Sequence, residues 1–107
     1  MTAITNDTIK SRVALTALKN VFDPEIGLNI VDLGLIYQIN FDEINSKIKV
    51  LMTLTTQFCP MGESITTAAK RALEITFPDT EIEVELTFDP LWNYERISEE
   101  GRFFLDQ

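Results

Sequence analysis

The 107-residue chain contains no histidine and a single cysteine, Cys59. Without histidine there is no Ser–His or Cys–His catalytic pair, and the commonest metal ligand in proteins is missing. One cysteine also excludes an intramolecular disulfide. A zinc or iron–sulfur site built from cysteine and histidine alone would therefore need ligands from a second chain or from a small molecule.

Long apolar runs are missing as well. No uninterrupted stretch approaches the roughly 20 apolar residues that a membrane-spanning helix needs, and residues 1–10 lack the basic start and apolar stretch of a signal peptide. We therefore expect no membrane partner and a cytoplasmic location. The length and the 45% of apolar residues predict one domain over residues 1–107, since no repeat or linker interrupts the chain.

Basic residues are few. The chain has 17 acidic and 9 basic residues and a net charge of −8 at pH 7, which opposes the phosphate-neutralising surface that nucleic-acid binding requires. A nucleic-acid partner is therefore not expected. The imbalance is concentrated in residues 79–107, which carry nine acidic and two basic side chains, whereas the preceding residues are close to neutral.

Three segments have the sequence features of helices: residues 7–22, 60–77 and 98–105. Asn6 or Asp7 is a suitable cap for the first helix, and Ser98 for the last. The apolar spacing predicts that the first helix buries Ile9, Val13, Ala14, Ala17, Leu18, Val21 and Phe22. The second is predicted to bury Ile65, Ala68, Ala69, Ala72, Leu73 and Phe77.

Three segments alternate between apolar and polar residues and predict strands: residues 35–41, 47–55 and 81–88. The polar residues 42–46 suit a hairpin between the first two. The last strand turns Glu81, Glu83 and Glu85 to solvent, where Lys47 and Lys49 on a neighbouring strand would offset them. The predicted fold is α+β: a small sheet, with a hairpin plus at least one further strand, carrying two main helices on one face in the order α-β-β-α-β, followed by a short C-terminal helix.

Cys59 lies where a predicted strand gives way to a predicted helix. The free amides and the positive dipole end at a helix start stabilise a thiolate, and Thr55 and Thr56 could add hydroxyl donors. A buried, unreactive cysteine is the alternative, because a lone cysteine is often a packing residue. Position alone leaves both interpretations open.

Two further segments combine an Asp-Pro turn with polar or aromatic side chains. In the first, Asp23, Glu25 and Asp32 could contact a metal or substrate. Alternatively, the carboxylates of Asp23 and Asp32 could accept hydrogen bonds from the amides of their own turns, and the sequence alone favours this second interpretation. In the second, Asp89 precedes Trp92 and Arg96. Aromatic residues and arginine are frequent at interfaces, but Trp92 could equally cap the core while Arg96 pairs with an acid.

Together these segments resemble the SufT/PaaD-like iron–sulfur cluster assembly domain family, whose members are metal–sulfur cluster biosynthesis factors. The resemblance spans residues 13–105 and depends on the order of four motifs: Asp23-Pro24-Glu25, Val31-Asp32-Leu33-Gly34, the threonine-rich loop that ends in Cys59-Pro60, and Asp89-Pro90-Leu91-Trp92 with Arg96 and Ser98 after it. Two positions depart from the family pattern, which often has proline in place of Gln57 and Leu91.

The resemblance implies a role for each motif. Cys59 would be the thiol that contacts a cluster or a partner and the one candidate metal ligand. The loop of residues 23–34 would contribute Asp23, Glu25 and Asp32. The late segment, residues 89–98, would contribute Asp89, Trp92, Arg96 and Ser98. It also implies transient handling of iron or an iron–sulfur cluster, with scaffold proteins or client apo-proteins as partners.

Three functions are compatible with these residues. The first is an assembly or maturation factor, not an enzyme, that assists cluster delivery through a reactive Cys59 loop; stable cluster binding would then need a homodimer, a partner or small thiols, because a cluster usually takes four ligands. The second is an adaptor that only binds proteins through its acidic end and the Trp92 loop. The third is a PaaD-like accessory factor for a multicomponent oxygenase.

A Cys59 thiol at a helix start is predicted to titrate below the pKa of about 8.5 of a free cysteine, because the helix dipole stabilises the thiolate. The measurement is the alkylation rate of the protein as a function of pH. An apparent pKa at or above the free value would contradict activation of this thiol.

Overall fold

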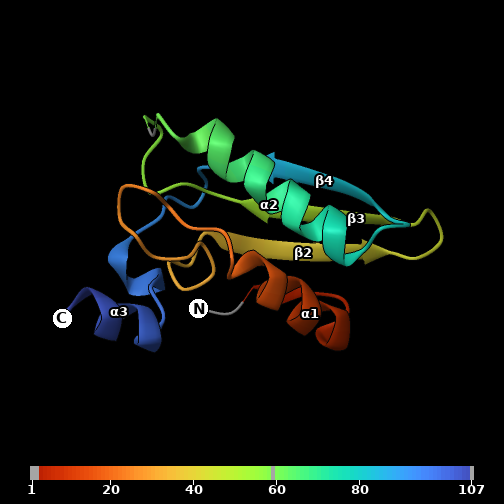
Figure 1. Cartoon of the computed structure of the whole chain (residues 1–107), viewed down its shortest axis with the longest axis horizontal. Helices are drawn as coiled ribbons and strands as arrows, with labels where there is room; N and C mark the ends of the chain where they lie inside the picture. Colours follow the sequence, from red (N-terminus) through yellow and green to blue (C-terminus); the bar gives the residue numbers. More distant parts are fainter. Residues whose placement is uncertain (1–2, 59, 107) are drawn as a thin grey trace.

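The computed structural model describes residues 3–58 and 60–106. In this part of the chain, a four-stranded sheet carries α1 and α2 on one face, and α3 lies beside loops at one end of the sheet (Figure 1). The elements are β1 (Ile4–Thr5), α1 (Thr8–Leu18), β2 (Ile36–Asp42), β3 (Lys47–Met52), α2 (Gly62–Thr76), β4 (Glu81–Leu86), the 3-10 turn η1 (Tyr94–Arg96) and α3 (Glu99–Leu105).

The sheet has the order β1-β2-β3-β4. β2 and β3 form the predicted antiparallel hairpin, with an irregular register between Ile36 and Gln38, while β1 runs parallel to β2 and β4 parallel to β3. The predicted α+β class and the order of its main elements are confirmed. β1 was not predicted, because two residues are too few to show the alternation that marks a strand.

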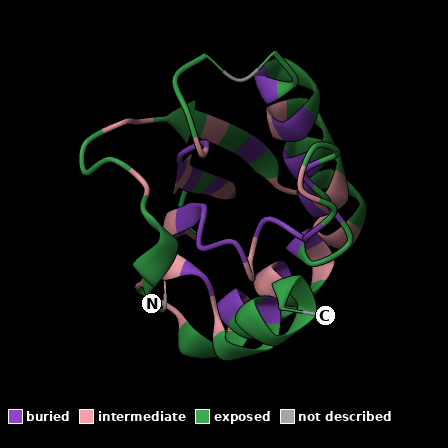
Figure 2. Cartoon of the chain, turned by 90° about the vertical axis from the view of Figure 1, so that its left-hand side faces the viewer, coloured by how far each residue is buried: buried purple, intermediate pink, exposed green. Residues whose placement is uncertain are grey.

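The core lies between the sheet and the two long helices. Buried residues alternate with more exposed ones along β2 and β3, and the helices cover this buried face of the sheet. Figure 2 shows the buried residues recurring along the strands and helices. The largest fully buried side chains on the strands and helices are Leu18, Ile39, Val50, Met52, Ile65 and Leu73. Each contributes about 1.5–3 kcal/mol by leaving water.

α1 buries only part of the predicted stripe: Ala14 and Leu18, and Val21 just after the helix, are buried as expected. Ile9, Val13 and Phe22 were expected inside, but their exposed fractions are 79%, 48% and 55%. The buried face is made by Ser11, Ala14 and Leu18. The apolar pattern could not place Ser11 on this face, because the pattern marks apolar residues only. The helix begins after Asp7, whose carboxylate accepts from the Lys10 amide as predicted.

α2 follows its predicted stripe more closely. Ile65, Ala69 and Leu73 are buried, Ala72 is half-buried, and Ala68 is exposed against expectation. Ala68 lies between Ile65 and Leu73 along the helix but one position off the face that the sheet covers. The predicted stripe was therefore one residue too wide.

The hairpin connection is held by short polar contacts. Asp42 accepts hydrogen bonds from the side-chain and backbone nitrogens of Asn45 at 2.8 and 3.1 Å, and these bonds keep the pKa of its carboxyl below the ordinary value. Ser46 has a positive φ of 50° at the end of the turn. Lys10 of α1 reaches the same connection and pairs with Glu43 at 2.6 Å.

The exposed face of the sheet carries the predicted ion pairs. Lys47 lies 3.3 Å from Glu83, and Lys49 lies 3.7 Å from Glu85. Because all four side chains are well exposed, each pair contributes little, within about 1 kcal/mol. Among the described residues, no helix has both the length and the apolar character that a membrane crossing requires.

Two similar substitutions on opposite faces of α2 are predicted to differ in how much they change the free energy of unfolding. Leu73→Ala removes a fully buried side chain and should lower the free energy of unfolding by about 2–5 kcal/mol through lost burial and a new cavity. Ile75→Ala, two residues on, removes a side chain that is 78% exposed and should change it by less than about 0.5 kcal/mol. Urea denaturation measures both, and similar losses would contradict this placement of the helix.

Candidate functional site

The segments singled out from the sequence meet at one end of the sheet (Figure 1). Residues 19–35 lead into β2, residues 53–61 link β3 to α2 and residues 87–98 follow β4. Backbone hydrogen bonds connect these segments at the strand ends: the Thr53 amide donates to the Leu35 carbonyl at 2.9 Å, and the Thr87 amide donates to the carbonyl of Met52, the last residue of β3, at 2.9 Å. The ends of neighbouring strands thus bring together residues that are far apart in sequence.

Asp23 is turned inward, into its own turn. Its side chain is only 2% exposed, and Oδ1 accepts from the amides of Glu25 and Ile26 at 2.9 and 3.3 Å. The Gly27 amide closes the turn on the Asp23 carbonyl at 2.8 Å. This carboxylate organises the turn, while the Glu25 side chain is exposed to solvent.

Asp32 joins two parts of the chain. Its carboxylate accepts from Asn29 Nδ2 at 2.6 Å and from Ser98 Oγ at 2.8 Å, and its backbone carbonyl accepts from the Ser98 amide at 2.7 Å. Ser98 Oγ in turn accepts from the Gly101 amide at 3.0 Å and so caps α3. One aspartate therefore fixes the start of α3 against the loop before β2.

Asn29 was missed by the sequence analysis. Its side-chain oxygen accepts from the amides of Val31 and Asp32 at 3.0 and 2.9 Å, a task that had been assigned to the Asp32 carboxylate. The signal was present, since an Asn at the start of a tight loop commonly bonds the amides two and three residues further on. With Asn29 in this role, Asp32 is free to reach Ser98.

Gly34 allows the late segment to pack against the loop. Its φ is +77°, and a Cβ atom there would overlap the Arg96 carbonyl oxygen and lie 2.7 Å from the Arg96 Cβ. Only glycine combines that backbone conformation with so close an approach. The loop and the late segment are therefore in direct backbone contact at this point.

The side chains of Trp92 and Arg96 stabilise this contact. Trp92 donates from Nε1 to the Leu33 carbonyl at 2.6 Å, and the Arg96 guanidinium lies 4.1 Å from the centre of the Tyr37 ring. Tyr37, another residue that the sequence analysis missed, donates from its hydroxyl to the Pro90 carbonyl at 2.8 Å. Arg96 is thus held by an aromatic ring and not by the acid that was one alternative for it.

Asp89 is exposed and forms part of a short turn in which its amide donates to Thr87 Oγ1 at 3.2 Å. Its carboxylate forms no hydrogen bond or ion pair with another described residue. Asp89 and Glu25 are therefore the two predicted acidic site residues whose carboxylates face solvent.

Cys59 lies outside the described residues, but its neighbours on both sides are described. Thr55 is half-buried, Thr56 is exposed and accepts from the Phe58 amide at 3.2 Å, and the Phe58 side chain is 87% exposed. Met61, the residue before α2, gives the helix no side-chain cap. The chain that leads to and from Cys59 is therefore largely open to water.

Gly62 lies close to the Leu54 side chain. A Cβ there would lie 2.7 Å from Leu54 Cδ1, so the lack of a side chain at Gly62 lets the segment after β3 pack against the start of α2. No group of three or more His, Cys, Asp and Glu side chains suited to a metal ion occurs within residues 3–58 and 60–106. The predicted carboxylates do not gather into a metal centre there.

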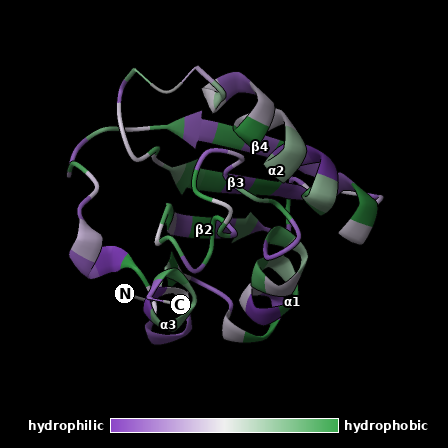
Figure 3. Cartoon of the chain, turned by 60° about the vertical axis from the view of Figure 1, so that its left-hand side comes forward, coloured by the Kyte–Doolittle hydropathy of each residue, from purple (hydrophilic) through white to green (hydrophobic). Residues whose placement is uncertain are grey.

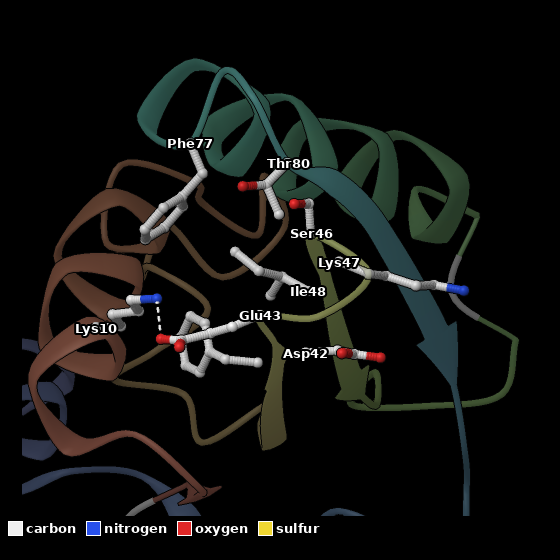
Figure 4. Close-up of a pocket in the computed structure, with 9 residues that line it drawn as sticks. Lys10, Asp42, Glu43, Ser46, Lys47, Ile48, Phe77 and Thr80 are labelled. Carbon is white, nitrogen blue, oxygen red and sulfur yellow. Dashed lines mark hydrogen bonds and ion pairs between the residues drawn. The ribbon is translucent and has the colours of Figure 1, made fainter.

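A cavity of about 320 Å³ lies at the opposite end of the molecule, between the start of α1, the hairpin and the turn before β4 (Figure 4). The Lys10–Glu43 ion pair crosses it, and Phe41, Phe77 and Ile48 form its apolar side. None of the predicted site residues lines this cavity.

Comparison with known proteins gives the class of this chain. The family model described as iron–sulfur cluster assembly protein matches residues 12–86. The match includes Asp23, Glu25, Asp32 and the segment around Cys59, and it ends before the late segment at Asp89. The chain belongs to this family, which confirms the resemblance seen in its motifs.

Three curated proteins are similar over most of their length. The Fe-S protein maturation auxiliary factor of Porphyromonas gingivalis is 37% identical, with 78% of this chain and 79% of that protein aligned. The auxiliary factor YitW of Bacillus subtilis is 35% identical, over 83% and 86%. The auxiliary factor SufT of Staphylococcus aureus is 36% identical, over 79% and 96%.

Solved structures share the fold. A domain of unknown function from Bacillus anthracis superposes with a TM-score of 0.83 at 36% identity, covering 90% of each chain. A conserved hypothetical protein from Thermotoga maritima gives a TM-score of 0.75 at 42% identity, covering all of both chains.

The contact between the loop before β2 and the late segment predicts that substitution of Gly34 destabilises the fold more than substitution of Gly27. Gly27→Ala should lower the free energy of unfolding by about 1–2 kcal/mol, because φ is +81° but no atom lies within 4 Å of the new Cβ. Gly34→Ala has the same backbone strain plus the overlap with Arg96, and should cost about 1–3 kcal/mol more. Urea denaturation followed by Trp92 fluorescence measures both; equal losses would contradict the close approach.

Proposed function

We propose that this chain is a maturation factor that assists delivery of iron–sulfur clusters to client proteins, with the Cys59 thiol as the group that contacts the cluster. Membership of the iron–sulfur cluster assembly family supports the general role, as do three similar proteins named Fe-S protein maturation auxiliary factors. In this proposal the cluster is cargo, and the chain is not an enzyme.

The observation that carries the proposal is the exposure of the segment around Cys59. Phe58 is 87% exposed, Pro60 and Met61 are exposed, and α2 begins at Gly62. The amides of the first turn of a helix lack partners within the helix and favour a negative charge nearby. A thiolate carried by this segment would be accessible to a partner and stabilised by the helix start.

A single thiolate favours transfer over storage. A cluster usually takes four ligands, and the carboxylates of Asp23 and Asp32 are already committed to amide and hydroxyl donors of their own chain. Glu25 and Asp89 stay available as weak oxygen ligands. The remaining ligands would come from a scaffold protein, a client apo-protein or a second copy, so the cluster could leave without unfolding the chain.

A protein-binding adaptor, including an accessory factor of an oxygenase, is the second candidate. Leu91 and Tyr94 in the late segment are 63% and 75% exposed, and the surrounding chain is acidic. Exposed aromatic and aliphatic side chains in a charged frame favour protein contacts. In this second proposal the contact would use the late segment and would not need the thiol.

Cys59→Ser tests the thiol. The variant should keep its urea unfolding midpoint, because the substitution is small and its neighbours are exposed, but it should lose Cys59-dependent visible absorbance after anaerobic reconstitution with iron and sulfide. In cells, client enzymes should then lose cluster content. Undiminished client clusters in this variant would refute the thiol mechanism and leave the adaptor.

A second variant tests whether the thiol must lie at position 59 or can lie elsewhere on the surface. Cys59→Ser combined with Ile75→Cys keeps one thiol per chain but moves it to an exposed site at the far end of α2. It should behave like Cys59→Ser. Full recovery of client cluster content would show that the position at the helix start is not required.

A further inference from the structure

The outer edge of the sheet is formed by β4. β4 pairs with β3 on one side, and the sheet order places no described strand on its other side (Figure 1). Six residues pair one to one with β3, from Lys47 opposite Glu81 to Met52 opposite Leu86, without a bulge. Neither a proline nor an irregularity interrupts this edge, although such features commonly protect edge strands.

The backbone groups that face outward can be identified from the pairing. The amides of Glu81 and Thr87 donate inward, to Ser46 and Met52 at 2.8 and 2.9 Å. Because successive residues of a strand direct their amides to opposite sides, Ile82, Val84 and Leu86 direct theirs away from the sheet. These three residues offer donors and carbonyl acceptors to an added strand.

A shallow groove of about 340 Å³ runs along the same edge. The groove is lined by Ile82 and Val84 of β4 and by Thr66, Thr67 and Lys70 of α2. Further charged side chains border it as well: Lys47, Glu81 and Glu83. Val84 is half-buried and Leu86 is 41% exposed on this side. A strand added to β4 would therefore cover apolar surface on its helix-facing side.

The other side of such a strand would meet a row of acids. Glu81, Glu83 and Glu85 alternate with the apolar residues of β4, which gives its ribbon alternating colours in Figure 3. Only two lysines of β3 pair with this row, and Glu81 forms no ion pair with any other described residue. Cross-strand neighbours of opposite charge are stabilising, so the row favours lysine or arginine at alternate positions of the added strand.

The same row disfavours a second copy of β4. In an antiparallel pair, directly opposite residues point to the same face. Since the outward amides are those of even-numbered residues, any antiparallel pairing of two β4 strands would set the glutamates of one copy opposite those of the other. Like charges in this position are destabilising, so the edge opposes self-association and selects a different partner.

From this geometry we infer that β4 is a docking edge for an extended segment of a partner protein that alternates basic and apolar residues. The segment adds a fifth strand by hydrogen bonding to Ile82, Val84 and Leu86, with its basic side chains beside Glu81, Glu83 and Glu85. This interaction does not involve Cys59, so it stands or falls independently of the proposed function.

The probe is a synthetic peptide of about nine residues, near strand length, in which lysine and valine alternate. Amide hydrogen exchange is followed by NMR on the full chain. With the peptide at ten times its Kd, exchange at Ile82, Val84 and Leu86 should slow by about tenfold, whereas Thr87, which already donates to Met52, should change little. Unchanged exchange at the three outward amides at about 1 mM peptide, enough to detect a Kd of that order, would overturn the inference.

Two comparisons test the charge argument. A peptide with glutamate in place of lysine should fail to protect the three amides, and Glu81→Lys/Glu85→Lys should weaken binding of the lysine peptide by about tenfold. Glu95→Lys/Glu99→Lys makes the same change in net charge away from β4. It should change the Kd of the lysine peptide by no more than about twofold, because only the screened long-range attraction is reduced. Equal binding of both peptides would overturn the charge selection, and protection that rises with protein concentration alone would assign the edge to a second copy.

Discussion

The close contact between the loop before β2 and the segment after β4 is the constraint on which this end of the molecule depends. Gly34 lies against the Arg96 backbone, and Trp92 donates to Leu33. Asp32 receives both the side chain and the amide of Ser98. The polar groups of this contact satisfy one another, and within the described residues no buried side-chain nitrogen or oxygen lacks a partner. Loops without regular structure thereby acquire a fixed shape.

The sequence contained most of the fold because its strands and α2 are strongly patterned. Glu81 to Leu86 alternates without exception, and the polar hairpin and the Asp7 and Ser98 caps are local signals that nothing in the tertiary structure opposes. α1 was oriented only in part: Ala14 and Leu18 were correctly placed inside, whereas Ile9 and Val13 were not. Ile9 and Val13 are apolar enough for a core, but the covered face includes the polar Ser11, which an apolar pattern does not mark.

The candidate site was predictable as a set of segments but not as a set of roles. Spacing marked Asp23, Asp32, Trp92 and Arg96 as unusual, and the structure places all four where they hold loops in position. Their partners, such as Asn29 and Tyr37, became recognisable only once distant segments were brought together. The family model ends at residue 86, so the roles of residues in the late segment became clear only from their contacts with the loop before β2.

The small size of Gly101 bears on how the chain reaches its final form during synthesis. A Cβ at this position would lie 2.9 Å from Ile97 Cγ2 and 3.0 Å from Leu28 Cδ2, so α3 sits directly on a loop made some seventy residues earlier. A domain generally folds as a unit, and α3 is synthesised after every other helix and strand of the described chain. The loop around Leu28 must wait, incompletely covered, until α3 arrives, and this interval is when a chaperone would have most to recognise.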